Sequence, residues 1–162
     1  MYAQSKSSAG PRRTGYNRPV PTRLRMGLVM RRDMEFGELG DVEGALRAEG
    51  VGLAPISTGD ASLVTGGVTV LATATANDIV EGRLRGLVVP GGSQDEASLA
   101  AVRSLVDLAR ANDLLVIAFA DGVAVAAESF GVAAEAHGAL FKDGKATLLN
   151  ERAELSAAVS VL

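Results

Sequence analysis

The sequence contains no cysteine and only one histidine, His137. Without cysteine the chain has no disulfide, no thiolate metal site and no thiolate nucleophile, and nothing in it indicates an oxidising compartment. One histidine cannot form a His-rich metal cluster, so we expect His137 to be a loop residue and the protein to need no metal or cofactor. No apolar run approaches the roughly 18 to 20 residues that cross a membrane. We therefore expect a cytoplasmic protein with no membrane partner.

Acidic residues are missing from the first 25 positions, where six lysines and arginines give a charge of +6. The rest of the chain must then carry −9 to give the net charge of −3. Residues 1–22 are rich in Ser, Gly, Pro and Arg, so they cannot bury enough apolar surface to offset the entropy lost on ordering. We expect a disordered basic leader over 1–22, followed by a single domain over 23–162.

The basic leader has alternative interpretations: a weak nucleic-acid or membrane-surface arm, or a targeting peptide, although it lacks the apolar region of a secretory signal. The acidic domain would repel phosphates, so we expect nucleic acid as a partner only through this leader.

From residue 24 onward, aliphatic runs alternate with amphipathic segments. We expect strands at 24–30, 51–56, 87–89 and 114–119, a hairpin of 62–65 with 68–73, a second hairpin of 139–141 with 146–149, and helices at 39–50, 96–109, 123–130 and 151–162. Ser93 with Glu96 predicts a capping box for the second of these helices, and Asn150 predicts a cap for the last. Buried strands alternating with helices indicate an α/β fold, a flavodoxin-like three-layer sandwich with a mostly parallel sheet.

In such a sheet, ligands bind outside the carboxyl ends of the strands. Three loops should meet there: 31–37, 90–93 and 120–123. Gly91, Gly92 and Gly122 are therefore candidate ligand-binding residues, because glycines before a helix let an anion approach the backbone amides. A tight strand-to-helix turn also requires glycine, so packing is the alternative explanation.

The third loop lies where an α/β enzyme would hold an exposed catalytic Ser or Cys on a sharp strand-to-helix turn. The residue at that position is Ala120. A methyl group cannot attack a carbonyl, so the sequence predicts the scaffold of an enzyme more clearly than a reaction.

The segment 85–92, which ends in Pro-Gly-Gly, and the segment 118–122, Ala-Phe-Ala-Asp-Gly, resemble the ThiJ/PfpI superfamily with its class I glutamine-amidotransferase-like fold. Members of that superfamily carry a strand ending in PGG and an elbow of the type A-x-C-H-G. The resemblance places Glu35, in the acidic turn 33–38, at the carboxylate that partners the elbow cysteine. Ala120 stands where the family has Cys, and Asp121 where many members have His. The resemblance thus implies a vestigial pocket of Glu35, Ala120 and Asp121.

The C-terminal domain of large-subunit haem catalases is also similar, in the hairpin 66–72, the strand end 88–90 and the elbow 118–121. That domain has lost the elbow cysteine and has no known chemistry of its own. The resemblance implies a non-catalytic module, with a link to oxidative stress. A single histidine cannot rebuild a haem pocket, so no peroxide chemistry follows from it.

Glu35 and Asp121 also have structural explanations: Glu35 as an acid at a helix start and Asp121 as the N-cap after the elbow. If the two carboxylates converge, they can serve general acid/base chemistry. Three functions remain open. The first is a non-catalytic module for oligomerisation, stability or small-ligand binding, acting as a homo-oligomer or within a larger enzyme assembly. The second is a cysteine-independent hydrolase or lyase using Glu35 and Asp121, and the third is a regulatory or nucleic-acid-associated protein using the leader.

Overall fold

The computed structural model describes residues 24–59, 61–65 and 67–160. The predicted leader, 1–22, lies outside these residues, so its disorder and the domain boundary at 22/23 stay predictions. No helix in the described part of the chain is long and apolar enough to cross a membrane.

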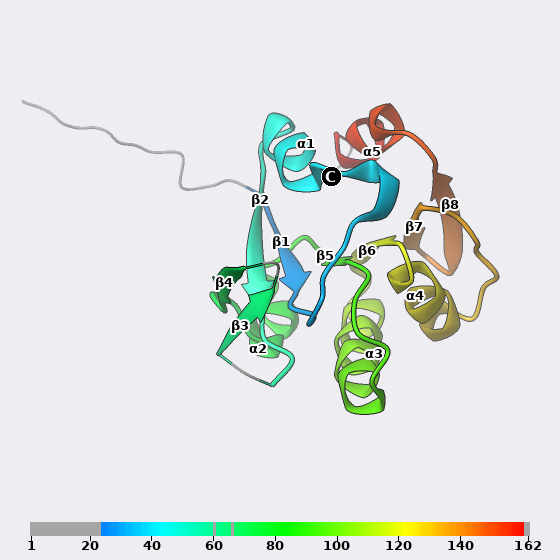
Figure 1. Cartoon of the computed structure of the whole chain (residues 1–162). Helices are drawn as coiled ribbons and strands as arrows, with labels where there is room; N and C mark the ends of the chain where they lie inside the picture. The colour runs from blue at the N-terminus through cyan, green and yellow to red at the C-terminus, as the bar shows by residue number, and fades with distance from the viewer. Residues whose placement is uncertain (1–23, 60, 66, 161–162) are drawn as a thin grey trace, which may run out of the picture.

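A six-stranded sheet forms the centre of the molecule, in the order β2-β1-β5-β6-β7-β8 (Figure 1). Its strands are β1 (Leu24–Val29), β2 (Val51–Ile56), β5 (Gly86–Val89), β6 (Leu115–Phe119), β7 (Gly138–Lys142) and β8 (Lys145–Leu149). The first four in space run parallel, and β7 and β8 continue the sheet antiparallel. The predicted α/β sandwich with a mostly parallel sheet is confirmed.

Helices cover both faces of the sheet (Figure 1). They are α1 (Val42–Ala48), α2 (Ala76–Val80), α3 (Glu96–Ala111), α4 (Gly122–Phe130) and α5 (Arg152–Val159), with a 3₁₀ turn, η3, at Gly37–Leu39. The apolar residues of α1 and α5 form one core cluster with the sheet, and those of α2, α3 and α4 form the other. The molecule is therefore a three-layer sandwich.

The sequence of each strand matches its place in the sheet. Residues 86–89 and 115–119 are buried throughout, as continuous aliphatic runs in central strands require. Pro55 lies in β2, which is an edge strand. Proline has no N–H to donate to a neighbouring strand, so it is tolerated at the edge of a sheet. The Pro55 carbonyl accepts hydrogen bonds from Thr73 and Ala74.

Three helix starts differ from the sequence expectation, because nearby acids supply the caps. Helix α3 is capped by Asp95, whose carboxylate accepts from the Ser98 N–H, while the Ser93 hydroxyl accepts from the Asp95 N–H. Helix α5 is capped by Glu151 in a box with Glu154, so the predicted Asn150 cap was wrong.

The first helix begins at Val42 rather than Leu39, because Asp41 caps it at the Gly44 N–H. Leu39 instead ends the preceding 3₁₀ turn. The short helix α2 begins with a capping box formed by Thr75 and Asp78, and it was not expected from the sequence.

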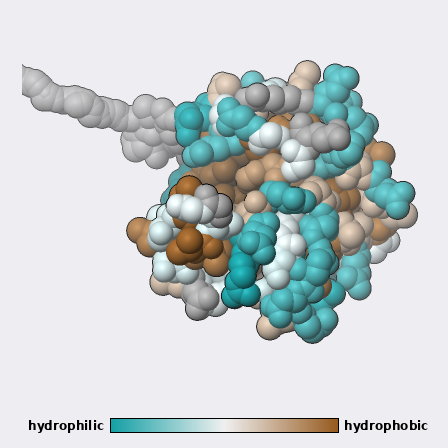
Figure 2. Space-filling model, in the orientation of Figure 1, coloured by the Kyte–Doolittle hydropathy of each residue, from teal (hydrophilic) through white to brown (hydrophobic). Residues whose placement is uncertain are grey.

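The predicted hairpin of β3 (Ser62–Thr65) and β4 (Val68–Leu71) is confirmed as a separate two-stranded antiparallel sheet. It exposes three large apolar side chains, with 66% of Val64, 60% of Val68 and 63% of Leu71 accessible. Apolar surface gathers over this hairpin in Figure 2.

Candidate functional site

The carboxyl ends of β1, β5 and β6 bring the three predicted loops to the same edge of the sheet. β1 lies between β2 and β5, and the helices that follow β1 and β5, α1 and α3, cover opposite faces. This is the topological switch point, where open α/β sheets hold their ligands.

Arg31 connects these loops through hydrogen bonds. Sequence analysis did not identify it as a candidate site residue. Arg31 lies two residues after the end of β1 at Val29, and its side chain is fully buried. Nη1 donates to the Pro90 carbonyl at 2.8 Å and to Oδ1 of Asp121 at 3.3 Å, and Nη2 donates to the Ser93 carbonyl at 2.8 Å. Burial lowers the pKa of the Arg31 guanidinium below its ordinary value, while the Asp121 carboxylate acts against that shift. Arginine nevertheless stays protonated.

The Arg31 Nε is different from the other guanidinium nitrogens. Among the buried side-chain nitrogens and oxygens of the described residues, it is the one with no hydrogen-bond partner. An unpaired buried donor costs free energy, so the hydrogen bonds of Nη1 and Nη2 offset the burial of this side chain only in part.

Asp121 occupies the N-cap position of α4, as expected, but its side chain does not cap the helix. Its Oδ1 accepts from the Gly92 N–H at 3.0 Å and from Arg31. The expectation that the carboxylate caps the helix was therefore wrong, because these two donors from neighbouring loops hold it.

Ala120 has the backbone of an elbow. Its φ is +51°, in the left-handed region that residues other than glycine seldom adopt. Its N–H donates to the His137 carbonyl at 3.0 Å, and its own carbonyl accepts from Val123 at 3.2 Å. Such strain persists only where the surrounding structure imposes it, and it clusters at functional sites.

Glu35 does not begin a helix. It forms an isolated antiparallel bridge with Gly91, in which each N–H donates to the other's carbonyl, at 3.0 and 2.7 Å. The side chain of Glu35 is exposed. This bridge brings the first loop against the second.

The three candidate glycines lie where the loops pack most closely. A Cβ on Gly91 would lie 2.7 Å from the Ala120 Cβ, 2.8 Å from Oδ1 of Asp121 and 2.9 Å from Cγ of Glu35. Glu35, Ala120 and Asp121 thus converge around Gly91. A Cβ on Gly92 would lie 2.8 Å from the Arg31 Cβ, and one on Gly122 would lie 2.7 Å from the Val89 carbonyl. A side chain at any of the three positions would meet atoms closer than 3.0 Å, so close packing favours glycine there. Their predicted role in ligand binding stays a prediction.

No three His, Cys, Asp or Glu side chains gather to form a metal site within the residues that the structure describes. His137 lies before β7 and contributes its carbonyl to the elbow.

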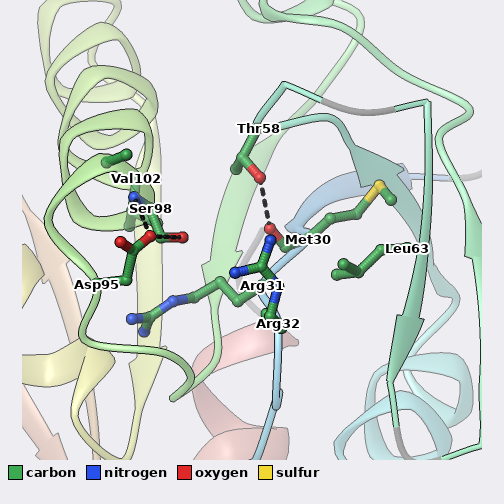
Figure 3. Close-up of a pocket in the computed structure, with 9 residues that line it drawn as sticks. Met30, Arg31, Arg32, Thr58, Leu63, Asp95, Ser98 and Val102 are labelled. Carbon is green, nitrogen blue, oxygen red and sulfur yellow. Dashed lines mark hydrogen bonds between the residues drawn. The ribbon is translucent and has the colours of Figure 1, made fainter.

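A cavity of about 170 Å³ opens at this edge, between the end of β1, the β3–β4 hairpin and the start of α3 (Figure 3). Its polar lining includes Arg31, Arg32 and Asp95. In Figure 3 the Arg31 side chain runs from β1 toward α3. The Asp95 carboxylate accepts a hydrogen bond from the Ser98 hydroxyl at 2.8 Å. This bond and the one from the Ser98 N–H lower the pKa of Asp95.

No family model matches the chain, and no curated protein is similar to it in sequence. Solved structures are similar in fold. A ThiJ/PfpI domain protein from Brachyspira murdochii is 15% identical, with a TM-score of 0.61, over 85% of this chain and 94% of the other. A DJ-1 superfamily protein from Agrobacterium tumefaciens is 20% identical, with a TM-score of 0.58, over 86% of this chain and 88% of the other.

A mutant of a DJ-1 superfamily protein from Salmonella typhimurium is 19% identical, with a TM-score of 0.52, over 67% of this chain. The matched region spans 62% of the length of the Salmonella protein. At these identities the similarity concerns the fold. The chain therefore has the α/β fold of DJ-1/ThiJ/PfpI proteins, in agreement with the resemblance of its motifs.

Proposed function

We propose that this chain is a non-catalytic domain with the DJ-1/ThiJ/PfpI fold, and that it binds a small ligand at the carboxyl edge of its sheet. Ala120 carries the proposal. Its backbone has the left-handed conformation expected of a nucleophile elbow, but its side chain is a methyl group. A covalent intermediate cannot form on that residue.

The contacts of the elbow support a structural role. Asp121 accepts hydrogen bonds from Arg31 and from the Gly92 N–H, so its carboxylate joins the loops after β1, β5 and β6. Both hydrogen bonds go to Oδ1, so they fix the orientation of the carboxylate between the three loops.

A cysteine-independent hydrolase or lyase is the second candidate function. It is favoured by the convergence of Glu35 and Asp121 on either side of Gly91. In such an enzyme the exposed Glu35 would take a proton from water or substrate, and Asp121 would orient the reacting group.

The two candidates are separated by an activity panel of glyoxalase, deglycase, peptidase and ester-hydrolysis assays on the full chain. We expect the wild type and Glu35→Gln to give the same rate as a buffer blank. The matched control is Glu43→Gln, which removes an exposed acid from α1. Turnover by the wild type and by Glu43→Gln that is lost in Glu35→Gln would establish the hydrolase or lyase instead.

The proposal also includes assembly, as a homo-oligomer or as part of a larger enzyme, together with a cytoplasmic location and a link to oxidative stress. Assembly is supported by the apolar surface of the β3–β4 hairpin. The link to oxidative stress rests on the resemblance of the elbow and hairpin sequences to the catalase C-terminal domain.

A further inference from the structure

The outer edge of β8 carries backbone groups that no other part of the described chain uses. β8 lies at one end of the six-stranded sheet, so one of its edges has no neighbouring strand (Figure 1). We propose that this edge binds an extended basic peptide of another protein as an additional strand, antiparallel to β8. The inference goes beyond the proposed function, because it uses neither the elbow nor a ligand at the carboxyl edge.

The register of the β7–β8 hairpin shows which groups point outward. Its loop consists of residues 143 and 144, both with positive φ, +53° and +73°. Such a two-residue loop makes the two flanking lysines a hydrogen-bonded pair, and hydrogen-bonded pairs alternate along an antiparallel ladder. Thr147 therefore bonds to β7, whereas the N–H and C=O groups of Ala146 and Leu148 point to the free edge.

These outward groups are available to a further strand. Within the described residues, neither Ala146 nor Leu148 makes a backbone hydrogen bond outside the ladder. Leu148 is 44% exposed, and Thr147 is exposed as well. Proteins often block a sheet edge with a proline, a bulge or a charge. Residues 146–149 contain no proline and no charge, and their pairing with β7 has no bulge.

An apolar groove of about 820 Å³ lies beside this edge. Ala146 and Leu148 share a face of β8 and line the groove, together with apolar residues of α4 and of the segment 132–134. Directly opposite residues of an antiparallel pair have their side chains on the same face. A peptide residue opposite Leu148 would therefore place its side chain against the groove, where an aliphatic group would be buried.

The charged side chains of the groove are both acidic. They are Glu128 and Glu135, and both are exposed. Glu128 lies 3.4 Å from Arg103, whereas Glu135 makes no ion pair with a described residue. Complementary charge favours lysine or arginine in the peptide. A second copy paired through β8 would instead bring two acidic grooves together on one face, so charge favours a basic partner over self-pairing.

The test is a titration of the ¹⁵N-labelled full chain with the peptide acetyl-Lys-Thr-Val-Thr-Lys-amide, followed by NMR. We expect saturable shifts of the Ala146 and Leu148 amides, with a Kd of about 0.1–1 mM for so short a peptide. Hydrogen exchange of these two amides should slow when the peptide binds. The counterpart with glutamate in place of both lysines should bind about tenfold more weakly.

N-methylated peptides distinguish strand pairing from simple contact with the groove. In the antiparallel arrangement, the lysines and the valine face the groove and direct their N–H groups to β8, while the threonines direct theirs away. N-methylvaline at the centre should therefore abolish saturable binding. The matched control, N-methylation of one threonine, should change Kd by less than about twofold.

Two pairs of protein variants locate the site. Leu148→Pro removes an outward N–H at a sheet edge, where proline is tolerated, and should abolish binding, whereas Leu148→Thr keeps the N–H and should weaken binding about threefold. Glu135→Gln should also weaken binding about threefold, the size expected for an exposed ion pair. Its matched control, Glu49→Gln, removes an exposed acid at the end of α1 and should leave Kd unchanged.

Three results would overturn the inference: absence of saturable shifts at Ala146 and Leu148, any pattern other than selective loss with N-methylvaline, or equal weakening by Glu135→Gln and Glu49→Gln. The N-methylated peptides decide the question on the wild type even if Leu148→Pro does not fold. None of these results involves turnover or a ligand at the carboxyl edge. Failure of the peptide site is therefore distinguishable from failure of the proposed function.

Discussion

The Ala120 elbow combines a strained backbone with an unreactive side chain. The positive φ of Ala120 is held from both sides, by the His137 carbonyl and by the start of α4. Around it, Arg31 joins three loops through hydrogen bonds to two carbonyls and one carboxylate. The elbow is therefore a packed junction whose geometry does not depend on a nucleophile.

Gly91 is the residue on which this packing can be measured. In Gly91→Ala the new Cβ would lie 2.7 Å from the Ala120 methyl carbon and 2.8 Å from an Asp121 oxygen. We expect a loss of about 1–3 kcal/mol in the free energy of unfolding, the usual cost of overpacking. Urea denaturation of the full chain gives this quantity.

The matched control is Gly52→Ala in β2, where an added Cβ meets nothing within 4 Å. It should be neutral or slightly stabilising, because alanine reduces the entropy of the unfolded chain. Equal stability of the two variants would show that the loops around Gly91 move to accommodate the added Cβ and do not form a packed junction.

The cap of α3 gives a prediction that depends on pH. Hydrogen bonds from the Ser98 hydroxyl and N–H lower the pKa of Asp95 below its ordinary 3.8, so folding favours the charged carboxylate. Its stabilising contribution is complete above about pH 4 and is lost as the pH falls through the lowered pKa of the folded state. Asp95→Ala should therefore lower the urea midpoint at pH 7, and the deficit should shrink as the solution is acidified.

Asp95→Asn is the control, because asparagine caps a helix but does not titrate. It should keep most of the stability at pH 7. If the Asp95→Ala deficit were the same at neutral and acid pH, the charged cap would not be its cause.

The strands and the long helices could be predicted from sequence because periodicity and aliphatic runs report burial directly. β2 was predicted to the residue, and the turns at Gly66-Gly67 and Asp143-Gly144 indicated both hairpins. Caps were harder, because several acids and hydroxyls lie near each helix start and local geometry selects among them. Asp95 was selected over Ser93 in this way.

The candidate site could be predicted only in part. The convergence of three loops follows from the parallel sheet, and it places Glu35, Ala120 and Asp121 around Gly91. The role of Arg31 could not be predicted, because its partners lie 59 to 90 positions away in the chain. One signal was available: an arginine two residues after a buried strand must find acceptors at the carboxyl edge.

For the molecule as a whole, the β3–β4 hairpin is the surface on which we expect self-association. Val64 and Leu71 are both more than 60% exposed and lie on the same face of the hairpin, and exposed apolar side chains that share a face often mark an interface. The sedimentation velocity of the wild type should increase with concentration. The double variant Val64→Thr/Leu71→Thr should stay monomeric with an unchanged thermal midpoint, because these side chains contribute little to the core.

Leu148→Thr serves as the control, because Leu148 is 44% exposed on β8, an edge strand of the six-stranded sheet that does not include the hairpin. It should associate as the wild type does. A wild type that remains monomeric, or a double variant that associates equally well, would contradict a self-association surface on the hairpin.

The central claim is that the chain keeps the backbone of a nucleophile elbow and carries Ala120 at its centre. The most direct test replaces the missing atom, in Ala120→Cys, and measures the rate of iodoacetamide labelling of the native protein. The backbone already accommodates a Cβ at positive φ, and Ala120 is half-buried, so the variant should fold with an unchanged thermal midpoint. The control is Val88→Cys, at a position that is 0% exposed in β5. We predict faster labelling of Ala120→Cys, because a helix N-terminus favours the reactive thiolate, whereas equally slow labelling at both positions would contradict the claim.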